Sequence, residues 1–124
     1  MKFLYTEKAP EAVGPYSQGV EAGEMIFTSG QLPINPETEE LISDDIKKAT
    51  LQSLKNVENI LKTAGSSAEK IIKVNIYLKD MNDFAAMNEV YGEFFGEHKP
   101  ARSCVEVTRL PKDGIIEIEA IALK

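Results

Sequence analysis

The sequence predicts an α+β domain in which a single β-sheet carries two helices on one face. Two segments, residues 44–64 and 83–95, have the apolar spacing of amphipathic helices, and shorter segments of strand character flank them. The predicted order of elements is β-β-β-α-β-α-β-β, which is typical of the α+β class. The 124 residues show no repeat, linker or shift in composition, so we expect one domain over residues 1–124.

The N-terminal third is predicted to contain three strands and a long loop. Residues 3–5 form a short extended run, and residues 19–32 indicate a hairpin that turns at residues 22–24. Residues 33–43 contain two prolines and are predicted to be a loop.

The two helices are predicted from apolar side chains that recur every three to four residues. The first ends before Gly65, where a left-handed C-terminal cap is favourable. The second places large side chains along one stripe, which is the pattern of a helix packed against a core. This stripe consists of Phe84, Met87, Tyr91, Phe94 and Phe95.

Three further strands are predicted, over residues 71–79, 101–107 and 115–123. Side-chain alternation assigns each residue to one of two faces of the sheet. One face of the first of these strands carries Ile72, Val74, Ile76 and Leu78, and one face of the last carries Ile116, Ile118, Ala120 and Ala122.

The other face of the last predicted strand mixes carboxylates with large aliphatic side chains. Its residues are Ile115, Glu117, Glu119, Ile121 and Leu123. Because an exposed apolar patch is a usual mark of an interface, we predict that a second copy of the chain covers this face. The sequence thus predicts a homo-oligomer whose sheets face one another.

Composition argues against several classes of function. The net charge of −6 disfavours nucleic acid and anionic membranes as partners, because each requires a basic face. The single cysteine excludes an internal disulfide, and the single histidine argues against a His-based metal site or a Ser-His-Asp triad. No apolar run has the length of a membrane span and no signal peptide is apparent, so we expect a cytoplasmic protein.

Arg102 is the first candidate functional residue, because a long charged side chain within a strand requires a partner or a ligand. Two interpretations are open: a bidentate clamp on a substrate carboxylate, or a salt bridge to Glu117 or Glu119. If the last two strands form a hairpin with Cys104 opposite Glu117, then Arg102, Cys104 and Glu117 share one face. Glu117 is then a candidate general base for a water molecule, with a structural ion pair as the alternative and Glu119 as a competitor.

Three other positions have both a functional and a structural interpretation. Cys104 is either a nucleophile, which would need a nearby base or positive field, or a small buried side chain. Tyr16 lies in a turn and either lines a site or covers the core. Gly30 ends a strand, where it either lets a ligand approach the backbone or marks a bulge.

Three segments of the chain resemble the RidA (YjgF-like) family of reactive intermediate deaminases. They are GPYSQGVEAGEMIFTSGQLP, VYGEFFGEHKPARSCVEV and RLPKDGIIEIEAIA, and the resemblance extends over residues 3–123. It implies a chorismate-mutase-like fold and a homotrimer in which three sheets form a central β-barrel, with a cleft at each subunit interface. It also implies hydrolysis of 2-iminobutanoate and 2-iminopropanoate to 2-keto acids and ammonia, which protects pyridoxal-phosphate enzymes.

The resemblance also implies roles for individual residues. Arg102 would bind the substrate carboxylate and Glu117 would activate water, with no cofactor and no metal. The pocket residues that it implies are Tyr16, Ser29, Gly30, Asn88 and Cys104.

Two alternative functions remain open. A keto-acid-binding regulator would need Arg102 without needing Glu117, and some relatives carry older names as translation inhibitors. A pericyclic enzyme of the chorismate mutase type would bind a dicarboxylate, which calls for several cationic groups where this chain offers one.

Overall fold

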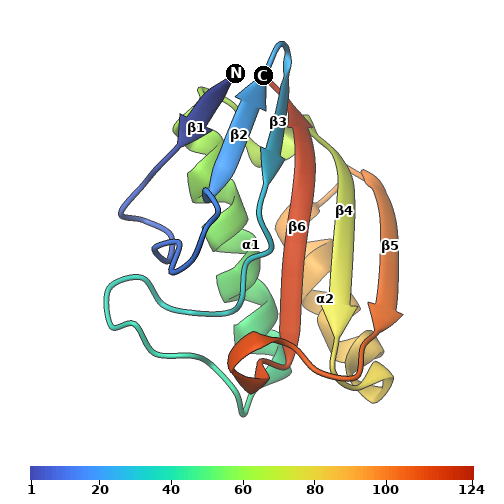
Figure 1. Ribbon diagram of the computed structural model, residues 1–124. Coiled ribbons are helices and arrows are strands. Elements are labelled where there is room, and N and C mark those ends of the chain that lie inside the picture. Colours follow the sequence, from blue (N-terminus) through green and yellow to red (C-terminus); the bar gives the residue numbers. More distant parts are fainter.

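The computed structural model describes residues 1–124 and contains one six-stranded sheet with two helices on one side (Figure 1). The elements in chain order are β1 (Lys2–Leu4), β2 (Gly19–Ala22), β3 (Met25–Thr28), α1 (Ile46–Lys62), β4 (Ile71–Leu78), α2 (Phe84–Phe95), β5 (Ala101–Glu106) and β6 (Ile116–Leu123). Short 3-10 helices span Ala68–Lys70, Met81–Asp83 and Pro111–Asp113. The predicted α+β class, the order of elements and the position of both helices on one face are confirmed.

The strand order in the sheet is β1-β2-β3-β6-β4-β5. The predicted β2–β3 hairpin is confirmed, and β6 lies between β3 and β4, antiparallel to both. The predicted hairpin of β5 and β6 is wrong, because β4 separates them and β5 pairs with β4 in parallel. The reason is that α2 returns the chain to the end of the sheet where β4 begins, as the crossover between two parallel strands requires.

The face of the sheet that meets the helices forms the core. On β6 this face is buried and carries Ile116, Ile118, Ala120 and Ala122, as predicted. Ile72 was predicted to join it but is 40% exposed, since an irregularity in the β4–β6 register between Ile71 and Lys73 buries Ile71 instead. Ile115, predicted to lie on the opposite face, precedes β6 and packs against the core.

Helix α1 has the termini that its sequence indicates. The Asp45 carboxylate accepts a hydrogen bond from the Lys48 backbone N–H at 3.1 Å, which caps the N-terminus. Gly65 follows the C-terminus with φ = 77°, the left-handed conformation that was predicted there. Helix α2 buries Met87 and Phe95, so its predicted apolar stripe does face the core.

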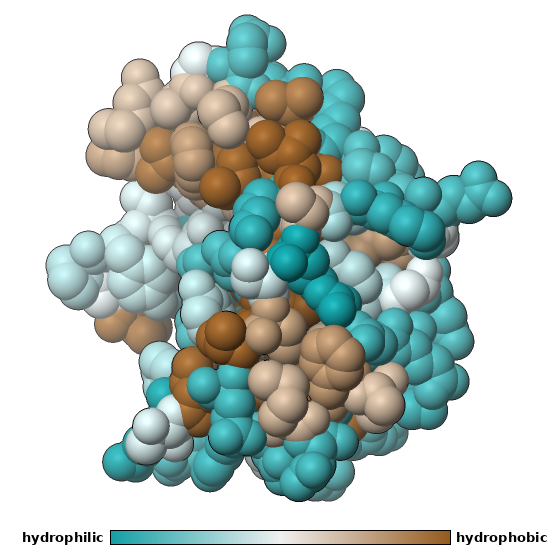
Figure 2. Space-filling view, turned by 90° about the vertical axis from the view of Figure 1, so that its right-hand side faces the viewer, coloured by the Kyte–Doolittle hydropathy of each residue, from teal (hydrophilic) through white to brown (hydrophobic).

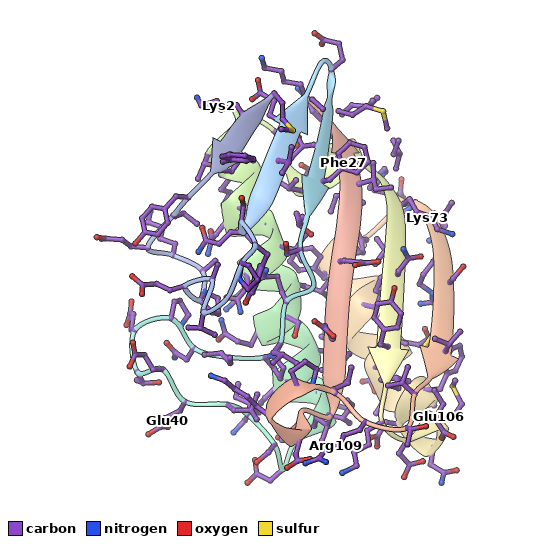
Figure 3. All side chains as sticks on the ribbon, viewed as in Figure 1. Lys2, Phe27, Glu40, Lys73, Glu106 and Arg109 are labelled. Carbon is purple, nitrogen blue, oxygen red and sulfur yellow. The ribbon has the colours of Figure 1, made fainter.

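The sheet face opposite the helices, here called the open face, is not covered by any element of the chain. It carries exposed apolar side chains, among them Phe27, Val105 and Leu123. Phe27 and Lys73, labelled in Figure 3, lie in the upper half of the sheet on β3 and β4. Seen from the side of β5, apolar groups gather above and below a hydrophilic band (Figure 2). The second copy expected on this face stays a prediction.

No helix of the chain combines the length and apolarity that crossing a membrane would require.

Candidate active site

A cleft of about 1120 Å³ lies beside the central strand β6. Its walls are the N-terminal loop of residues 5–18, the segment 28–39 that leaves β3, and the turn at Pro111 and Lys112. Figure 1 shows both loops extending from the β1–β3 side of the sheet. The cleft contains the predicted site residues Tyr16, Ser29, Gly30 and Glu117, together with Glu119.

Gln18 holds the N-terminal loop in place at the cleft. Its buried side chain accepts a hydrogen bond from the Thr6 backbone N–H at 2.7 Å. Its amide nitrogen donates to the carbonyl oxygens of Thr6, Ala9 and Pro10 at 3.0, 3.2 and 2.8 Å. One side chain thus satisfies the polar backbone of the wall that carries Tyr16.

Asn56 of α1 fixes the opposite wall. The amide nitrogen of this fully buried side chain donates to the carbonyl oxygens of Leu32 and Ile34 at 3.2 and 2.9 Å. Gln52 orients it by donating to its amide oxygen at 2.9 Å. The helix therefore supports the loop after β3 in addition to the loop's own backbone hydrogen bonds, such as those from Asn35 to Glu40 and from Ile42 to Pro33.

The floor of the cleft is a close contact between Gly30 and Glu117. A Cβ at position 30 would overlap a carboxylate oxygen of Glu117 and lie 2.7 Å from its carboxyl carbon. Ser29 anchors this backbone, since its amide donates to the Gln18 carbonyl at 2.9 Å and its hydroxyl to the Ser17 carbonyl at 2.6 Å. Gly30 therefore permits a close approach, as one of its two interpretations proposed, and the group that approaches is the Glu117 side chain.

Glu117 and Glu119 lie in the same cleft but in different surroundings. Glu119 accepts hydrogen bonds from the Tyr77 hydroxyl at 2.8 Å and from the Asn75 amide at 3.1 Å. Glu117 receives no hydrogen bond from the chain, and burial, followed by the negative charge of Glu119, raises its pKa. Glu119 is thus held as an acceptor within the sheet, whereas Glu117 is a free carboxylate with the raised pKa that suits a general base.

Arg102 lies outside this cleft, on the helix-facing side of β5. Its Nη1 donates to the Asn88 amide oxygen at 2.6 Å. Its Cζ lies 4.8 Å from the ring centroid of Tyr91 and 5.5 Å from that of Phe84. The alternative prediction of a salt bridge between Arg102 and a glutamate of β6 is therefore wrong, because its partners belong to α2.

Cys104 follows Arg102 on the same side of β5 and is half-buried. Burial raises the pKa of its thiol, and Arg102 opposes this shift without cancelling it. The raised pKa favours the small-side-chain interpretation over a nucleophile, which would need a lowered pKa. No group of three or more His, Cys, Asp or Glu side chains is arranged to hold a metal ion.

The prediction that Arg102 and Glu117 share one face is wrong within a single chain. Arg102 lies beside Val74 in the β4–β5 register, on the helix side, whereas Glu117 lies beside Tyr77 and opens into the cleft. The predicted site residues therefore form two groups. The arginine group consists of Arg102, Asn88 and Cys104; the cleft group consists of Tyr16, Ser29, Gly30 and Glu117.

The sequence interpretation did not single out Phe84 and Tyr91 as partners of Arg102, because both fit the apolar stripe of a helix. The signal was the spacing of Phe84, Asn88 and Tyr91, which puts all three on one face of α2. The supports of the cleft, Gln18 and Asn56, have no comparable signal in the sequence.

The chain and its fold have close counterparts among known proteins. A family model described as Endoribonuclease L-PSP matches residues 6–124. Over 126 aligned positions the chain is 54% identical to the 2-iminobutanoate/2-iminopropanoate deaminase of Escherichia coli K12, covering 99% of this chain and 98% of that protein. A RutC family protein of Pyrococcus horikoshii is 60% identical over 121 residues, which cover 98% of this chain and 96% of the relative.

The same likeness holds in three dimensions. The crystal structure of E. coli TdcF with bound serine matches with a TM-score of 0.96 and 50% identity, over 100% of this chain and 99% of that one. These matches define a small α+β protein of the Endoribonuclease L-PSP type. The chain belongs to the RidA/YjgF/TdcF family, and the resemblance seen in the sequence is confirmed.

Proposed function

We propose that this protein hydrolyses 2-imino acids, 2-iminobutanoate and 2-iminopropanoate among them, to 2-keto acids and ammonia without a cofactor. The observation that supports this most directly is Glu117, a carboxylate with no hydrogen bond from the chain and a raised pKa in a cleft. The 54% identity to a deaminase of this specificity supports the choice of substrate.

The chemistry needs a positioned water and a proton acceptor, because the carbon of a protonated imine is already electrophilic. Glu117 takes a proton from the water as the water oxygen bonds to C2, and gives it to the substrate nitrogen. Glu117 then accepts the hydroxyl proton as the C–N bond breaks and passes it to the departing ammonia, so the 2-keto acid and ammonium leave and the carboxylate is regenerated. One water is consumed and no electron is transferred.

Arg102 would hold the substrate carboxylate through charged hydrogen bonds, which are the stronger kind. Since Arg102 and Glu117 of one chain lie on opposite faces of the sheet, the site requires two copies. The arginine group of one protomer would meet the cleft group of its neighbour. The exposed apolar side chains of the open face support such an assembly, and we take it to be the homotrimer that the resemblance implies.

A keto-acid-binding regulator is the competing function. The serine in the TdcF crystal structure is a small carboxylate, which fits either a sensor or an enzyme. A sensor gains nothing from an unpaired carboxylate whose pKa is raised, so Glu117 favours hydrolysis. We expect the protein to act in the cytoplasm, next to the dehydratases that form these imines, and thereby to spare pyridoxal-phosphate enzymes.

The experiment is a coupled assay in which threonine dehydratase generates 2-iminobutanoate and the release of 2-oxobutanoate is followed. We expect the protein to accelerate release beyond the spontaneous rate, and Arg102→Ala to abolish the acceleration while circular dichroism stays unchanged. Arg109→Ala is the matched control, because Arg109 is exposed, forms an ion pair with Asp113 and does not line the cleft. Equal rates with and without the wild-type protein would exclude the proposed reaction.

A further inference from the structure

We propose that the rings of Tyr91 and Phe84 are positioning elements for Arg102, which hold its guanidinium group in orientation while leaving its charge free for a ligand. This inference rests on the proposed function, because it concerns the same carboxylate clamp.

The geometry supplies three contacts to one guanidinium from a single helix. Phe84, Asn88 and Tyr91 are spaced four and three residues apart, so they occupy one face of α2. The ring centroids of Tyr91 and Phe84 lie 4.8 and 5.5 Å from the Arg102 Cζ, both within the roughly 6 Å range of a cation–π contact. The Asn88 amide oxygen accepts from Nη1 at 2.6 Å and fixes the rotation of the group.

The nature of these partners matters as much as their position. An acidic side chain would orient Arg102 strongly, but it would occupy the donors that a substrate carboxylate needs and would cancel the charge. No ion pair of Arg102 occurs in the chain, and of its five N–H donors only one is engaged, by Asn88. Two aromatic faces and one amide therefore form a neutral cradle.

The contact of Tyr91 with Arg102 is made by its ring and not by its hydroxyl. This hydroxyl is buried and has no hydrogen-bond partner, an arrangement that costs stability. Burial also raises the pKa of Tyr91, with Arg102 opposing the shift, so the hydroxyl stays neutral. Neither the fold nor the cradle uses the hydroxyl, and a phenylalanine should serve equally well.

The kinetic test compares Tyr91→Leu and Phe84→Leu with Tyr91→Phe in the dehydratase-coupled assay. Loss of either ring should lower kcat/KM by about tenfold, chiefly through KM, because a loosened arginine binds the carboxylate less well. Tyr91→Phe, which keeps the ring, should have nearly the wild-type kcat/KM. Phe94→Leu is the control for lost packing: Phe94 lies on the same helix and packs on Phe95, not on Arg102.

A second readout is independent of catalysis. The chain has two arginines, so its NMR spectrum should contain two Nε–H signals, and Arg109→Lys assigns them. In the wild-type protein the ring currents of Tyr91 and Phe84 should displace the Arg102 signal upfield. The displacement should shrink in Tyr91→Leu and persist in Tyr91→Phe and Phe94→Leu.

The outcomes separate this inference from the function on which it rests. If Tyr91→Leu keeps both the wild-type kcat/KM and the Arg102 signal while Arg102→Ala is inactive, the role of the rings is overturned and the clamp stands. Full turnover by Arg102→Ala would overturn the clamp itself, and the role of the rings with it.

Discussion

Glu117 and Glu119 are two residues apart on β6 and open toward the same cleft, yet only Glu119 has hydrogen-bond donors. Two donors placed beside Glu117, as the Tyr77 hydroxyl and the Asn75 amide are placed beside Glu119, would lower the free-energy cost of burying its carboxylate. The fold places no such donors there. Glu117 is half-buried. A carboxylate that is partly withdrawn from water without hydrogen-bond partners lowers stability, and such groups concentrate at functional sites.

The first prediction concerns Glu117→Gln. We expect kcat to fall by about 10²–10⁴-fold, because the amide cannot accept the proton from water. Binding of 2-oxobutanoate should persist, since Arg102 still holds the carboxylate. Loss of binding together with turnover would assign Glu117 a structural role, and Glu119→Gln, the same change two residues along, should keep most of the activity.

Glu117→Gln should lower kcat but raise the free energy of unfolding at neutral pH. The folded protein binds a proton on Glu117 more tightly than the unfolded chain does, because the pKa is raised above its ordinary value of 4.5. Wild-type stability therefore declines as pH rises through the raised value, and Glu117→Gln should increase the free energy of unfolding at neutral pH but not below pH 4.5. Urea unfolding at both pH values measures this. Wild-type turnover, which needs the ionised carboxylate, should decline as pH falls through the same raised pKa.

A second prediction at this scale concerns Gly30→Ala. The added Cβ would displace the Glu117 carboxylate, so we expect lower kcat and a loss of roughly 1–3 kcal/mol in the free energy of unfolding, as for other overpacked sites. Gly92→Ala on α2 is the control, because its Cβ would meet nothing within 4 Å and a helix favours alanine. An active Gly30→Ala enzyme would show that the close contact with Glu117 is not required.

At the scale of elements, alternation in the sequence predicted the bounds of the strands and most of their faces, Ile72 and Ile115 excepted, but it could not predict which strands pair. The residues of β6 alternate as expected, whereas the β5–β6 pairing that seemed to join Arg102 with Glu117 is interrupted by β4. Alternation is a local property, while pairing depends on how the chain crosses the sheet. The helix predicted between the strands that became β4 and β5 already favoured a parallel pairing of these two strands. This indication outweighs the short turn before β6, which had suggested that β5 and β6 pair.

The irregular walls of the cleft lead to a third prediction. Gln18→Leu keeps the size of the side chain but removes four hydrogen bonds to the N-terminal loop, so we expect roughly 2–4 kcal/mol lower unfolding free energy. KM should rise, because the wall that carries Tyr16 is loosened. Thr63→Val after α1 is the control, since it removes a single hydrogen bond, to the Ile60 carbonyl, away from the cleft. Equal effects of the two substitutions in urea unfolding and in KM would contradict this role of Gln18.

For the whole molecule, the separation of the two groups of residues is the decisive property. The sequence predicted an oligomer from aliphatic residues such as Ile121 and Leu123 on β6. Its patterns also gave the candidate residues of both groups except Ser29 and Asn88, which the resemblance to the RidA family added. It could not predict that the sheet separates Arg102 from Glu117, because that depends on the position of β4. In the proposed assembly each chain would contribute two half-sites, and the chain itself supports both of them: α2 holds Arg102, and the two loops enclose Glu117.

The last prediction follows from this separation. Arg102→Ala and Glu117→Gln should each be inactive, but chains co-expressed with different affinity tags and purified through both tags should regain activity. An intact arginine from one chain then meets an intact glutamate from its neighbour. In a homotrimer with one repeated interface, each assembly that carries both tags has one intact site out of three, so we expect about a third of the wild-type turnover. A double variant carrying both substitutions, co-expressed with the Glu117→Gln chain, is the control and should stay inactive. If the mixed assemblies are inactive while the wild-type protein is active, both residues act within one chain and the shared site is excluded.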